Sequence, residues 1–558
     1  MPLVFKTCRN LFTLVLCLSL QFHDTAKALT ADWFTANTGY SPLYSAMPLP
    51  DGKVLIGGII QQTNVTPVHI GLERLLTDAT LDNTFTNGLI YSATIDPINC
   101  LSVKPDGKII VGGAGFKILG GISVFNIGQI GNDNLVDTNF AVLALMTNVV
   151  SSISCVIPLP KGKIMIAGSF QAAGTAGTDC IARLNDDGSI DTNFTSGISL
   201  EFEPTVYCVA PQSDGKILAS GRFSTLGGFS CAGMGRLNPD GSLDSTFNTN
   251  VYPGVGGDLD CMVVQRDGKI LVGGSFFNIA QGTNSNLARL NPDGTIDTGF
   301  SASIPNGNSE YYYVRSIALQ TDGKIVIGGS FQTIGGVPSP AIARLNSDGT
   351  KDTNFGFFLF SSIAVVFSTA IQADGNILAG GEFLNGFGSL FRVINPTPAT
   401  QNLSYDGTNI TWLRGGSSPE VWRTSFEYSG DGTNWIVLAD GTRISGGWQL
   451  TNVSIATNSF IRATGFATGG FHNGSCYLVQ SVIPKSPPTI ATGDGQFGFR
   501  SNYFGFNLSG TAGSTAVVQS SSNLVDWSPL STNIFPNAFV RDTNANGSTS
   551  QFYRVVSQ

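Results

Sequence analysis

Short apolar runs separated by glycine-containing turns recur through the first two thirds of the chain. The clearest example reads DGKILVGGSF and is preceded by another apolar run; close variants of this pattern appear seven times. A tight turn needs a positive φ that glycine accepts easily, so each copy predicts a β-hairpin. The steps between copies are 52 to 55 residues, and the turn glycines are Gly52, Gly107, Gly162, Gly215, Gly268, Gly323 and Gly375.

A second segment follows each hairpin and has the form Arg-Leu-Asn-x-Asp-Gly-x-x-Asp-x-x-Phe, clearest at residues 289–300 and 344–355. In the sixth unit, the apolar runs at 314–320, 324–332, 341–346 and 350–355 predict four strands. One four-stranded sheet cannot cover both of its faces, so the units must pack on each other. Radial stacking into a β-propeller achieves this and also protects the strand edges. The closing aromatics are Phe34, Phe85, Phe140, Phe194, Phe247, Phe300 and Phe355.

The phase of the repeat predicts how the ring closes. The element ending at Phe34 precedes the first hairpin, so it is a fourth strand without a unit of its own. At the other end, Arg392 matches Arg289, but Leu403 stands where the next closing Phe is expected. The last unit therefore lacks its outer strand, and residues 31–34 can supply it. We expect an all-β fold: a seven-bladed β-propeller over residues 29–395, closed by the N-terminal strand.

The motifs DGKILVGGSF and RLNPDGTIDTGF resemble the delta-60 repeat, a family of tandem modules in exported bacterial proteins, over roughly residues 40–395. The resemblance implies a propeller fold and an exported location. It implies no reaction and no catalytic residues.

Residues 1–28 read as a secretory signal. Lys6 and Arg9 precede a ten-residue apolar run, and Ala26-Lys27-Ala28 gives a cleavage site near Ala28. The run is about half of the ~20 residues that a membrane-spanning helix needs. We therefore expect the protein to be secreted, at the cell surface or in the periplasm, without membrane insertion.

The composition changes after residue 395, and five of the six tryptophans lie beyond this point. Residues 399–483 show alternating apolar runs that predict an immunoglobulin-like β-sandwich. The proline-rich stretch 484–488 reads as a stiff linker, and residues 489–558 predict a second small sandwich. Both resemble the immunoglobulin-like or fibronectin-like accessory domains of exported bacterial repeat proteins.

The net charge is −8, and it becomes −10 once the three basic and one acidic residues of the signal are removed. A net acidic chain is a poor partner for nucleic acid or an anionic membrane. Seven of the nine cysteines remain after cleavage. Four of them, with three serines, occupy one repeat position, where a small side chain on the innermost strand is expected. Cys180 and Cys231 lie near neighbouring strands, and a disulfide between them is left open.

Acidic turn residues raise the question of calcium. Asn-x-Asp-Gly-x-x-Asp offers oxygen ligands, but no unit adds the bidentate Glu of a calcium loop. Asp and Asn are also favoured in tight turns for their hydrogen bonds to the backbone. We expect no cofactor and interpret these residues as turn formers, with calcium as the alternative. The candidate ligands would be Asp187, Asp191, Asp293 and Asp297. The repeated arginines are expected to pair with a repeat Asp or with a carbonyl of the next unit.

Catalytic signatures are scarce. After signal cleavage only His69 and His472 remain, in different predicted domains, which disfavours a Ser-His-Asp triad. The long, variable connections of the repeat emerge on the face opposite the Asp-Gly turns, and function concentrates in such loops. Their acidic and tyrosine residues suit a sugar, a cation or a basic peptide. The candidate binding residues are Glu201, Glu203, Asp258, Asp260, Glu310, Tyr311 and Tyr312.

These patterns favour a non-catalytic scaffold for surface binding or adhesion, whose partner is an extracellular glycan or protein. The alternative is a propeller glycoside hydrolase or polysaccharide lyase that uses two loop carboxylates about 5–9.5 Å apart. A third interpretation is a purely structural envelope protein, which would have no pocket on the variable-loop face.

Overall fold

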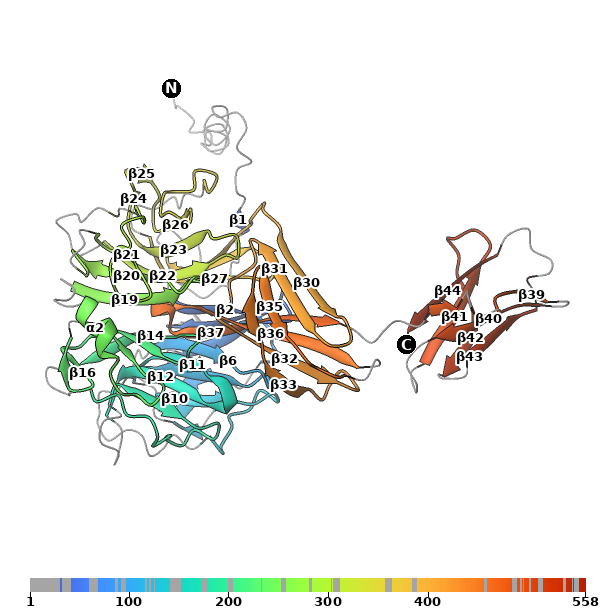
Figure 1. Ribbon diagram of the computed structural model, residues 1–558, viewed down its shortest axis with the longest axis horizontal. Coiled ribbons are helices and arrows are strands. Elements are labelled where there is room, and N and C mark those ends of the chain that lie inside the picture. The colour runs from blue at the N-terminus through green and yellow to red at the C-terminus, as the bar shows by residue number, and fades with distance from the viewer. Residues whose placement is uncertain are drawn as a thin grey trace, which may run out of the picture. The chain divides into compact units, whose positions relative to one another are not determined.

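The computed structural model contains almost only β-strands, in two compact units (Figure 1). Unit 1 holds the repeats together with residues 416–420 and 468–477; unit 2 holds residues 400–415, 421–467 and 478–558. In the part of the chain that the structure describes, no helix has the length and apolarity to cross a membrane. The described residues are 31–32, 42–59, 69–85, 89–91, 97–115, 118–119, 122–124, 126–140, 152–171, 179–198, 204–231, 233–251, 257–280, 284–302, 304, 312–356, 364–383, 389–455, 459–483, 489–491, 494, 496–500, 503–509, 515–534, 538–543, 545 and 551–557.

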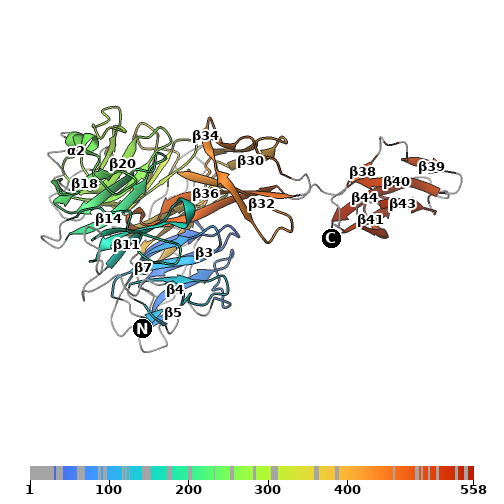
Figure 2. The ribbon, with the colours of Figure 1, turned by 60° about the horizontal axis from the view of Figure 1, so that its bottom comes forward.

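Each repeat forms an antiparallel sheet whose second strand lies between the first and the third. Figure 2 shows these repeat sheets in chain order from blue through green to yellow. The first strands are β2 (Leu43–Pro48), β6 (Ile98–Val103), β11 (Ser152–Pro158), β14 (Thr205–Pro211), β19 (Gly257–Val264), β22 (Tyr313–Leu319) and β27 (Val365–Ile371). The second strands are β3 (Val54–Gly58), β7 (Ile109–Gly113), β12 (Ile164–Ser169), β15 (Ile217–Arg222), β20 (Ile270–Phe276), β23 (Ile325–Ser330) and β28 (Ile377–Glu382). The third strands are β4 (His69–Leu75), β10 (Ile127–Ile130), β13 (Ile181–Leu184), β18 (Met234–Leu237), β21 (Leu287–Leu290), β26 (Ile342–Leu345) and β29 (Leu390–Val393).

Short elements complete unit 1. Strand β5 (Leu89–Tyr91) pairs with β4, and β1 (Ala31–Asp32) pairs with β29. The remaining elements are the hairpins β8 (Ile118–Leu119) with β9 (Ile122–Ser123), β16 (Thr225–Leu226) with β17 (Phe229–Ser230) and β24 (Thr333–Ile334) with β25 (Val337–Pro338), the helix α2 (Ser245–Val251), and the 3-10 turns η2 (Pro160–Gly162) and η3 (Phe471–Asn473).

The prediction of a fourth strand is wrong for the sixth repeat unit. Of residues 350–355, only Lys351 makes a β-bridge, to Leu345. The backbone N–H of Phe355 donates to the Asp352 carbonyl at 3.0 Å, and Asp352 Oδ1 accepts from Asn354 N at 3.0 Å. A carboxylate that accepts from the backbone two residues on stabilises a turn in place of a strand. The chain therefore bends, and the Phe355 side chain becomes buried.

The two ends of the repeat region meet in space. Ala31 lies opposite Val393 and Asp32 opposite Arg392, in antiparallel register. On the first strands, Ala46 N donates to Ser368 Oγ at 3.1 Å across 322 residues of sequence. Phe34, the aromatic that the sequence places in this element, lies outside the described residues.

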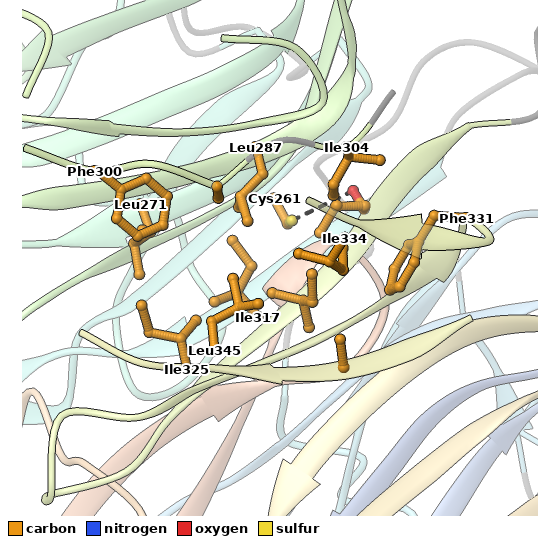
Figure 3. Packing of buried hydrophobic residues seen from close by; sticks show 14 of the residues in the cluster. Cys261, Leu271, Leu287, Phe300, Ile304, Ile317, Ile325, Phe331, Ile334 and Leu345 are labelled. Carbon is orange, nitrogen blue, oxygen red and sulfur yellow. Dashed lines mark hydrogen bonds between the residues drawn. The ribbon is translucent and has the colours of Figure 1, made fainter. Parts of the chain in front are cut away.

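Neighbouring repeat sheets pack through apolar side chains. Between the fifth and sixth sheets, the buried cluster includes Leu271 and Leu287 from one sheet, Ile317 and Ile325 from the other, and the closing aromatic Phe300 (Figure 3). Burial of such side chains stabilises by about 1.5–3 kcal/mol each. Each sheet therefore depends on its neighbours for its core.

A charged trio joins adjacent sheets on the side of the Asp-Gly turns. Asp191 Oδ2 accepts from Arg183 Nε at 2.8 Å and from Lys163 Nζ at 3.0 Å. Arg183 Nη1 donates to the Pro239 carbonyl of the next sheet at 2.6 Å, and its guanidinium lies over the Phe194 ring. The expectation that a repeat arginine pairs with an Asp or with a neighbouring carbonyl is confirmed for Arg183, which makes both contacts.

Unit 2 contains two groups of sheets. The first group packs around Trp412, whose ring leaves no room for a side chain at Gly465. Its strands are β30 (Ala399–Tyr405), β31 (Ile410–Gly416), β35 (Gly447–Leu450) and β34 (Thr442–Ile444) in one sheet, and β33 (Ile436–Asp440), β32 (Arg423–Ser429), β36 (Phe460–Gly469) and β37 (Ser475–Ile483) in the other. The end of β36 and the start of β37 belong to unit 1, where Cys476 of β37 pairs with Ser102 of β6.

The second group has its own core, centred on Phe506, Leu508, Val518 and Val540. Its strands are β38 (Thr489–Ala491), β39 (Gly498–Arg500), β40 (Tyr503–Ser509) and β43 (Ala538–Asp542) in one sheet, and β42 (Ser528–Ile534), β41 (Thr515–Ser521) and β44 (Phe552–Ser557) in the other.

Candidate functional site

Residues 468–477, which we call the axial segment, belong to unit 1 although they lie far beyond the repeats in sequence. Their turn η3 contacts the first strands β11, β14, β19, β22 and β27. The sequence predicts that His472 lies in a sandwich domain formed by residues 399–483. The compact units instead group residues 468–477 with the repeat sheets, so His472 shares a unit with the acidic residues of the repeats.

Asn473 anchors the tip of the axial segment and uses both ends of its amide. Its Oδ1 accepts from Ile317 N at 2.8 Å, and its Nδ2 donates to the Ile317 carbonyl at 2.7 Å. Nδ2 also reaches the Met262 carbonyl at 3.3 Å. The side chain thereby takes the place of a backbone partner for β22 and links it to β19.

The rest of the axial segment is bonded to other first strands. Ser475 Oγ accepts from Leu101 N at 3.0 Å and lies 3.0 Å from Ser45 Oγ. The Gly474 carbonyl accepts from Val156 N at 2.8 Å, and Tyr477 Oη accepts from Ile371 N at 3.1 Å. Together with the Asn473 bonds, these contacts reach most of the first strands. The segment is therefore held in one position by buried hydrogen bonds.

A β-bulge near the start of every first strand marks one position in each repeat, and we call these seven positions the bulge ring. In each case the pairing with the second strand skips one residue, directly before the small Ser or Cys of the repeat. A bulge leaves its residue outside the ladder and re-aims the side chain. Six residue types occupy the seven positions: Tyr44, Asn99, Ser154, Tyr207, Asp260, Arg315 and Phe367.

The bulge ring meets the tip of the axial segment. The ring centroid of Phe471 lies 4.9 Å from that of Tyr44 and 5.7 Å from that of Phe367. His472 stacks on Phe471 at 3.7 Å and lies 4.8 Å from the Tyr207 ring. An aromatic cluster therefore joins residues from three first strands and the axial segment.

Asp260 and Arg315, on adjacent strands, form the charged part of this site. Arg315 Nη1 donates to Asp260 Oδ1 at 2.8 Å and to His472 Nε2 at 3.3 Å. The guanidinium also lies over the Tyr313 ring, 4.2 Å from its centroid. Because Nε2 accepts this bond, the neutral imidazole carries its proton on Nδ1.

Burial perturbs the titratable groups of the site. Desolvation raises the pKa of Asp260 to about 7; the Arg315 charge opposes this shift, and Asp258 adds to it. Burial, with the Arg315 charge, lowers the pKa of His472 well below its ordinary value, so the imidazole is neutral near pH 7. Burial also raises the pKa of the Tyr44, Tyr207 and Tyr313 hydroxyls. Clustered shifts of this kind are typical of functional sites.

Three buried polar atoms here have no hydrogen-bond partner among the described residues: Asp260 Oδ2, Arg315 Nε and His472 Nδ1. Asp260 is 2% exposed and His472 is 5% exposed. An unsatisfied buried polar atom costs about 1–3 kcal/mol, so such atoms are normally satisfied by water or a ligand. His472 and Asn473 also adopt left-handed backbone angles, with φ of 57° and 52°. Strain of this kind costs about 1–3 kcal/mol per residue and tends to cluster at functional sites.

The binding residues expected from the loops fall into two groups. Asp260 is in the bulge ring, and Asp258 lies two residues before it, half-buried, and acts on the Asp260 pKa. Tyr312 is half-buried and packs beside the core between the fifth and sixth sheets. The other four expected residues, Glu201, Glu203, Glu310 and Tyr311, lie outside the described residues.

The calcium candidates have other partners. Asp187 Oδ1 accepts from Ser189 N and Oγ, and Asp293 Oδ1 accepts from Thr295 N and Oγ1. Asp191 and Asp297 each pair with a Lys and an Arg. Within the described ranges, no three His, Cys, Asp or Glu side chains gather as a metal site would require. These contacts fit the turn interpretation.

The seven cysteines after residue 28 are all buried free thiols, Cys180 and Cys231 included. Burial raises the pKa of Cys180 to about 11 and that of Cys231 to about 12. The cysteines of the repeat position link successive first strands, because each Sγ lies near a carbonyl of the next one. The pairs are Cys100 with Ile153, Cys155 with Val209, Cys208 with Met262 and Cys261 with Val314.

Sequence reasoning missed Tyr44, Tyr207, Arg315 and Phe367, although a signal for them was present. The repeat position of the small Ser or Cys was recognised, and the residue directly before it is the one that changes from unit to unit. No comparable signal pointed to the axial segment, because residues 468–477 carry no trace of the repeat.

Comparisons with known proteins support the repeat fold. Five stretches match a family described as a β-propeller domain of unknown function (DUF5122), over residues 49–85, 160–194, 212–247, 265–300 and 320–355. Among curated proteins, none matches the chain. The prediction of an all-β chain built from propeller-type repeats is confirmed.

Several solved structures are similar to this chain at low sequence identity. A fungal alcohol oxidase of the AA5 family, in complex with copper, is 16% identical over 79% of this chain and 97% of its own, with a TM-score of 0.38. A GH74 xyloglucanase from Xanthomonas campestris is 11% identical over 82% of this chain and 75% of its own, with a TM-score of 0.26. A glycoside hydrolase is 13% identical over 73% of this chain and 93% of its own, with a TM-score of 0.18.

Proposed function

We propose that the chain is an exported binding protein that recognises an extracellular glycan or protein ligand through the variable-loop face of its β-propeller. The observation that carries this proposal is the bulge ring. Seven equivalent positions hold six different residue types, and two of these residues, Asp260 and Arg315, form a buried ion pair. A purely structural repeat has no need for such variation, whereas a binding site does.

The proposal includes a closed seven-bladed propeller over residues 29–395, completed by the N-terminal strand. The β1–β29 pairing and the bond from Ala46 N to Ser368 Oγ support it. Closure places all bulge-ring residues at one end of a common axis, so a single ligand can meet several of them.

The remaining parts are assigned as follows. Residues 1–28 act as a signal peptide that is removed near Ala28, and the mature chain is secreted or held at the cell surface or in the periplasm. The repeats belong to the delta-60 type. Residues 399–483 and 489–558 are immunoglobulin-like or fibronectin-like accessory domains, and the buried Trp412 between two sheets supports this for the first of them.

A glycan array probed with the mature chain tests the binding role. We expect the mature chain to bind some of the glycans on the array. We expect the Arg315→Ala variant to lose this binding, because the substitution removes the cation that pairs with Asp260 and contacts His472. Arg266→Ala is the matched control, since Arg266 is exposed in an Asp-Gly turn. Equal loss in both variants, or no binding to glycans or to surface proteins, would contradict the proposal.

A second candidate function is hydrolysis of a polysaccharide, favoured by the pKa of Asp260 near 7. A carboxyl group with this pKa is protonated in about half of the molecules at pH 7, and its protonated form can serve as a general acid, as glycosidases require. We expect such activity to fall as the pH rises through about 7 and to vanish in Asp260→Asn. Reducing-sugar release from a polysaccharide panel measures it, and activity that survives in Asp260→Asn would exclude this role.

A further inference from the structure

We propose that one end of the second group of sheets in unit 2 docks on a lipid bilayer through exposed apolar side chains, which we call the apolar tip. The tip consists of Phe499, Leu524, Val525 and Phe552, which are 65%, 57%, 77% and 37% exposed. The inference does not rest on the proposed glycan or protein binding. It gives the chain a way to be held at a membrane surface without crossing the bilayer.

Strand pairing brings the four tip residues to the same end of the two sheets. Phe499 on β39 pairs with Phe504 on β40, and their ring centroids lie 5.0 Å apart. The Phe504 ring stacks on Tyr553 of the opposite sheet at 5.2 Å, and Phe552 directly precedes Tyr553 in β44. Phe552 pairs with the last residue of β41, after which the turn with the other two tip residues begins. Apolar side chains that are exposed together mark contact with a protein or a membrane.

Hydrogen bonds hold the turn between β41 and β42 in one conformation. Asn523 Oδ1 accepts from Val525 N and Asp526 N, both at 2.9 Å, and Trp527 Nε1 donates to the Leu524 carbonyl at 3.2 Å. Leu524 has a left-handed φ of 62°, a conformation that disfavours a bulky side chain and usually falls to Gly or Asn. An exposed Leu in a strained position does not stabilise the fold, so its side chain points to another role.

The first group of sheets contains the same turn between β32 and β33, but without apolar residues at its exposed positions. There, the backbone N–H groups of Thr433 and Asn434 donate to Asp431 Oδ1, both at 2.8 Å. Gly432, with a φ of 80°, and Thr433 stand where the second group has its two apolar turn residues. Because the same turn forms with Gly and Thr, its geometry does not require Leu and Val. The apolar pair therefore serves a contact outside the turn.

Aromatic rings and guanidinium groups flank the tip on both sheets. The Arg541 guanidinium lies over the Tyr503 ring, 4.3 Å from its centroid, and Arg554 lies over the Trp527 ring at the same distance. Tyr503 begins β40 and Trp527 ends the turn, so both lie at the end of the domain that carries the tip. Tyr and Trp are enriched where the hydrocarbon of a bilayer meets water, and Arg extends its charge to the headgroups. The order of apolar tip, aromatic ring and basic group therefore matches the depth profile of a lipid leaflet.

Charge favours a lipid surface over a second copy of this chain. Docking of two tips on each other would bring the exposed Arg541 and Arg554 of both copies together, whereas lipid phosphate oxygens accept hydrogen bonds from guanidinium groups. Residues 489–558 contain three Asp and three Arg and so carry no net charge, although the whole chain carries −8. Asp526, the acidic residue of the turn, accepts from Asn523 Nδ2 at 2.8 Å. This region can therefore approach a zwitterionic bilayer without net repulsion.

Sedimentation of the mature chain (residues 29–558) with phosphatidylcholine vesicles tests the inference. We expect the chain to sediment with the vesicles, and the double variant Leu524→Gly/Val525→Thr to have a partition constant about tenfold lower. This variant copies the turn of the first group and relieves the strain at position 524, so its melting temperature should not fall. Val437→Thr is the matched control, because Val437 is 62% exposed on β33, outside the tip. It should bind like the unmodified chain.

A fluorophore that reports polarity shows whether the tip itself enters the bilayer. The seven cysteines after residue 28 are buried, so in folded Val525→Cys the introduced thiol is the one that reacts readily. Vesicles should shift the emission of this label to shorter wavelength and leave that of labelled Val437→Cys unchanged.

Three results would overturn the inference. They are no vesicle binding by the unmodified chain, equal binding by Leu524→Gly/Val525→Thr, and an unshifted label at position 525. Self-association that the double variant abolishes, without vesicle binding, would assign the tip to contact between copies instead. None of these results bears on glycan-array binding, so the proposed function stands or falls separately.

Discussion

At the scale of single residues, the repeat Asp of the charged trio does more than form a turn. Asp191 is 4% exposed and receives bonds from two cations, one of which also binds the next sheet. Asp187, in the same repeat motif, is exposed and serves only its own turn. The two residues have the same chemical identity and lie four positions apart, yet their energetic roles differ.

Asp191→Asn should lower the free energy of unfolding by about 2–3 kcal/mol, because it leaves Lys163 and Arg183 without their buried counter-charge. Asp187→Asn keeps a side-chain oxygen that can accept the turn hydrogen bonds, so it should change the free energy of unfolding by less than about 0.5 kcal/mol. Urea unfolding of both variants measures the difference. Equal effects would mean that the trio adds nothing beyond its turn.

The same group predicts loss of stability in acid. Hydrogen bonds and ion pairing with Lys163 and Arg183 outweigh the effect of burial and hold the pKa of Asp191 at about 2, against 3.8 ordinarily. Because the folded-state pKa is lowered, the stabilisation is present above pH ~4 and is lost as the pH falls from about 4 to 2. The corresponding pKa values of Asp82, Asp137, Asp244, Asp297 and Asp352 are also lowered.

Thermal unfolding between pH 6 and pH 2 tests this. The melting temperature should fall below pH 4, and the fall should be shallower in Asp191→Asn. A melting temperature that is constant from pH 5 to pH 2.5 would contradict the prediction.

At the scale of the element, the two Asp-Gly turns of one unit are not equivalent. Gly323 and Gly349 have φ of 85° and 88°, so both need glycine. A methyl group at Gly323 would meet only Ser347 Cβ at 3.6 Å, whereas at Gly349 it would meet Ala302 N at 2.7 Å and the Phe300 ring at 2.9 Å. The second turn is pressed against the preceding repeat.

Gly323→Ala should therefore cost about 1–2 kcal/mol from backbone strain alone. Gly349→Ala should lower the free energy of unfolding by clearly more, because a clash with the neighbouring repeat is added to the backbone strain. Chemical denaturation of the two variants compares them directly. A smaller loss in Gly349→Ala than in Gly323→Ala would contradict the packing of that turn.

The tip of the axial segment offers a second comparison. Asn473→Ala removes the partners of Ile317 N and of the Ile317 carbonyl, and one of the two partners of the Met262 carbonyl. Leaving buried backbone groups unpaired costs about 1–3 kcal/mol each, so we expect the free energy of unfolding to fall by at least about 2 kcal/mol. His472→Ala keeps those bonds and should cost less. Hydrogen exchange of the β22 amides should rise in Asn473→Ala only; equal exchange in both variants would argue against this anchor.

The sequence predicted the hairpins well because their cause is local: a glycine turn flanked by apolar runs. The prediction is wrong at residues 350–355. The alternation of apolar and polar residues there indicates a strand, but the Asp352 carboxylate accepts a hydrogen bond from Asn354 N and stabilises a turn. It placed Asp260 among the binding residues because acidic loop residues were sought there. It missed Arg315, because the role of this residue depends on a partner from the adjacent repeat. It also missed Phe471, because the repeat residues that contact its ring lie more than a hundred positions away in sequence.

At the scale of the whole molecule, unit 1 depends on contacts that span nearly the entire chain. Ser45 meets Ser475 across 430 residues, and Leu101 meets the same side chain across 374. Folds dominated by such distant contacts form slowly, since loop closure must precede the stabilising contacts. Because residues 468–477 hydrogen-bond to most of the first strands, we expect the repeats to reach their final packing only when this segment is in place.

The most direct test of this arrangement is a disulfide across the axis. In Ser45→Cys/Ser475→Cys, the two sulfur atoms would replace hydroxyl oxygens that lie 3.0 Å apart. Mild oxidation of the folded protein followed by proteolysis and mass spectrometry should yield a peptide pair joined between positions 45 and 475, absent from Ser45→Cys alone. If the folded double variant gives free thiols at both positions instead, the axial segment does not run through the middle of the repeats.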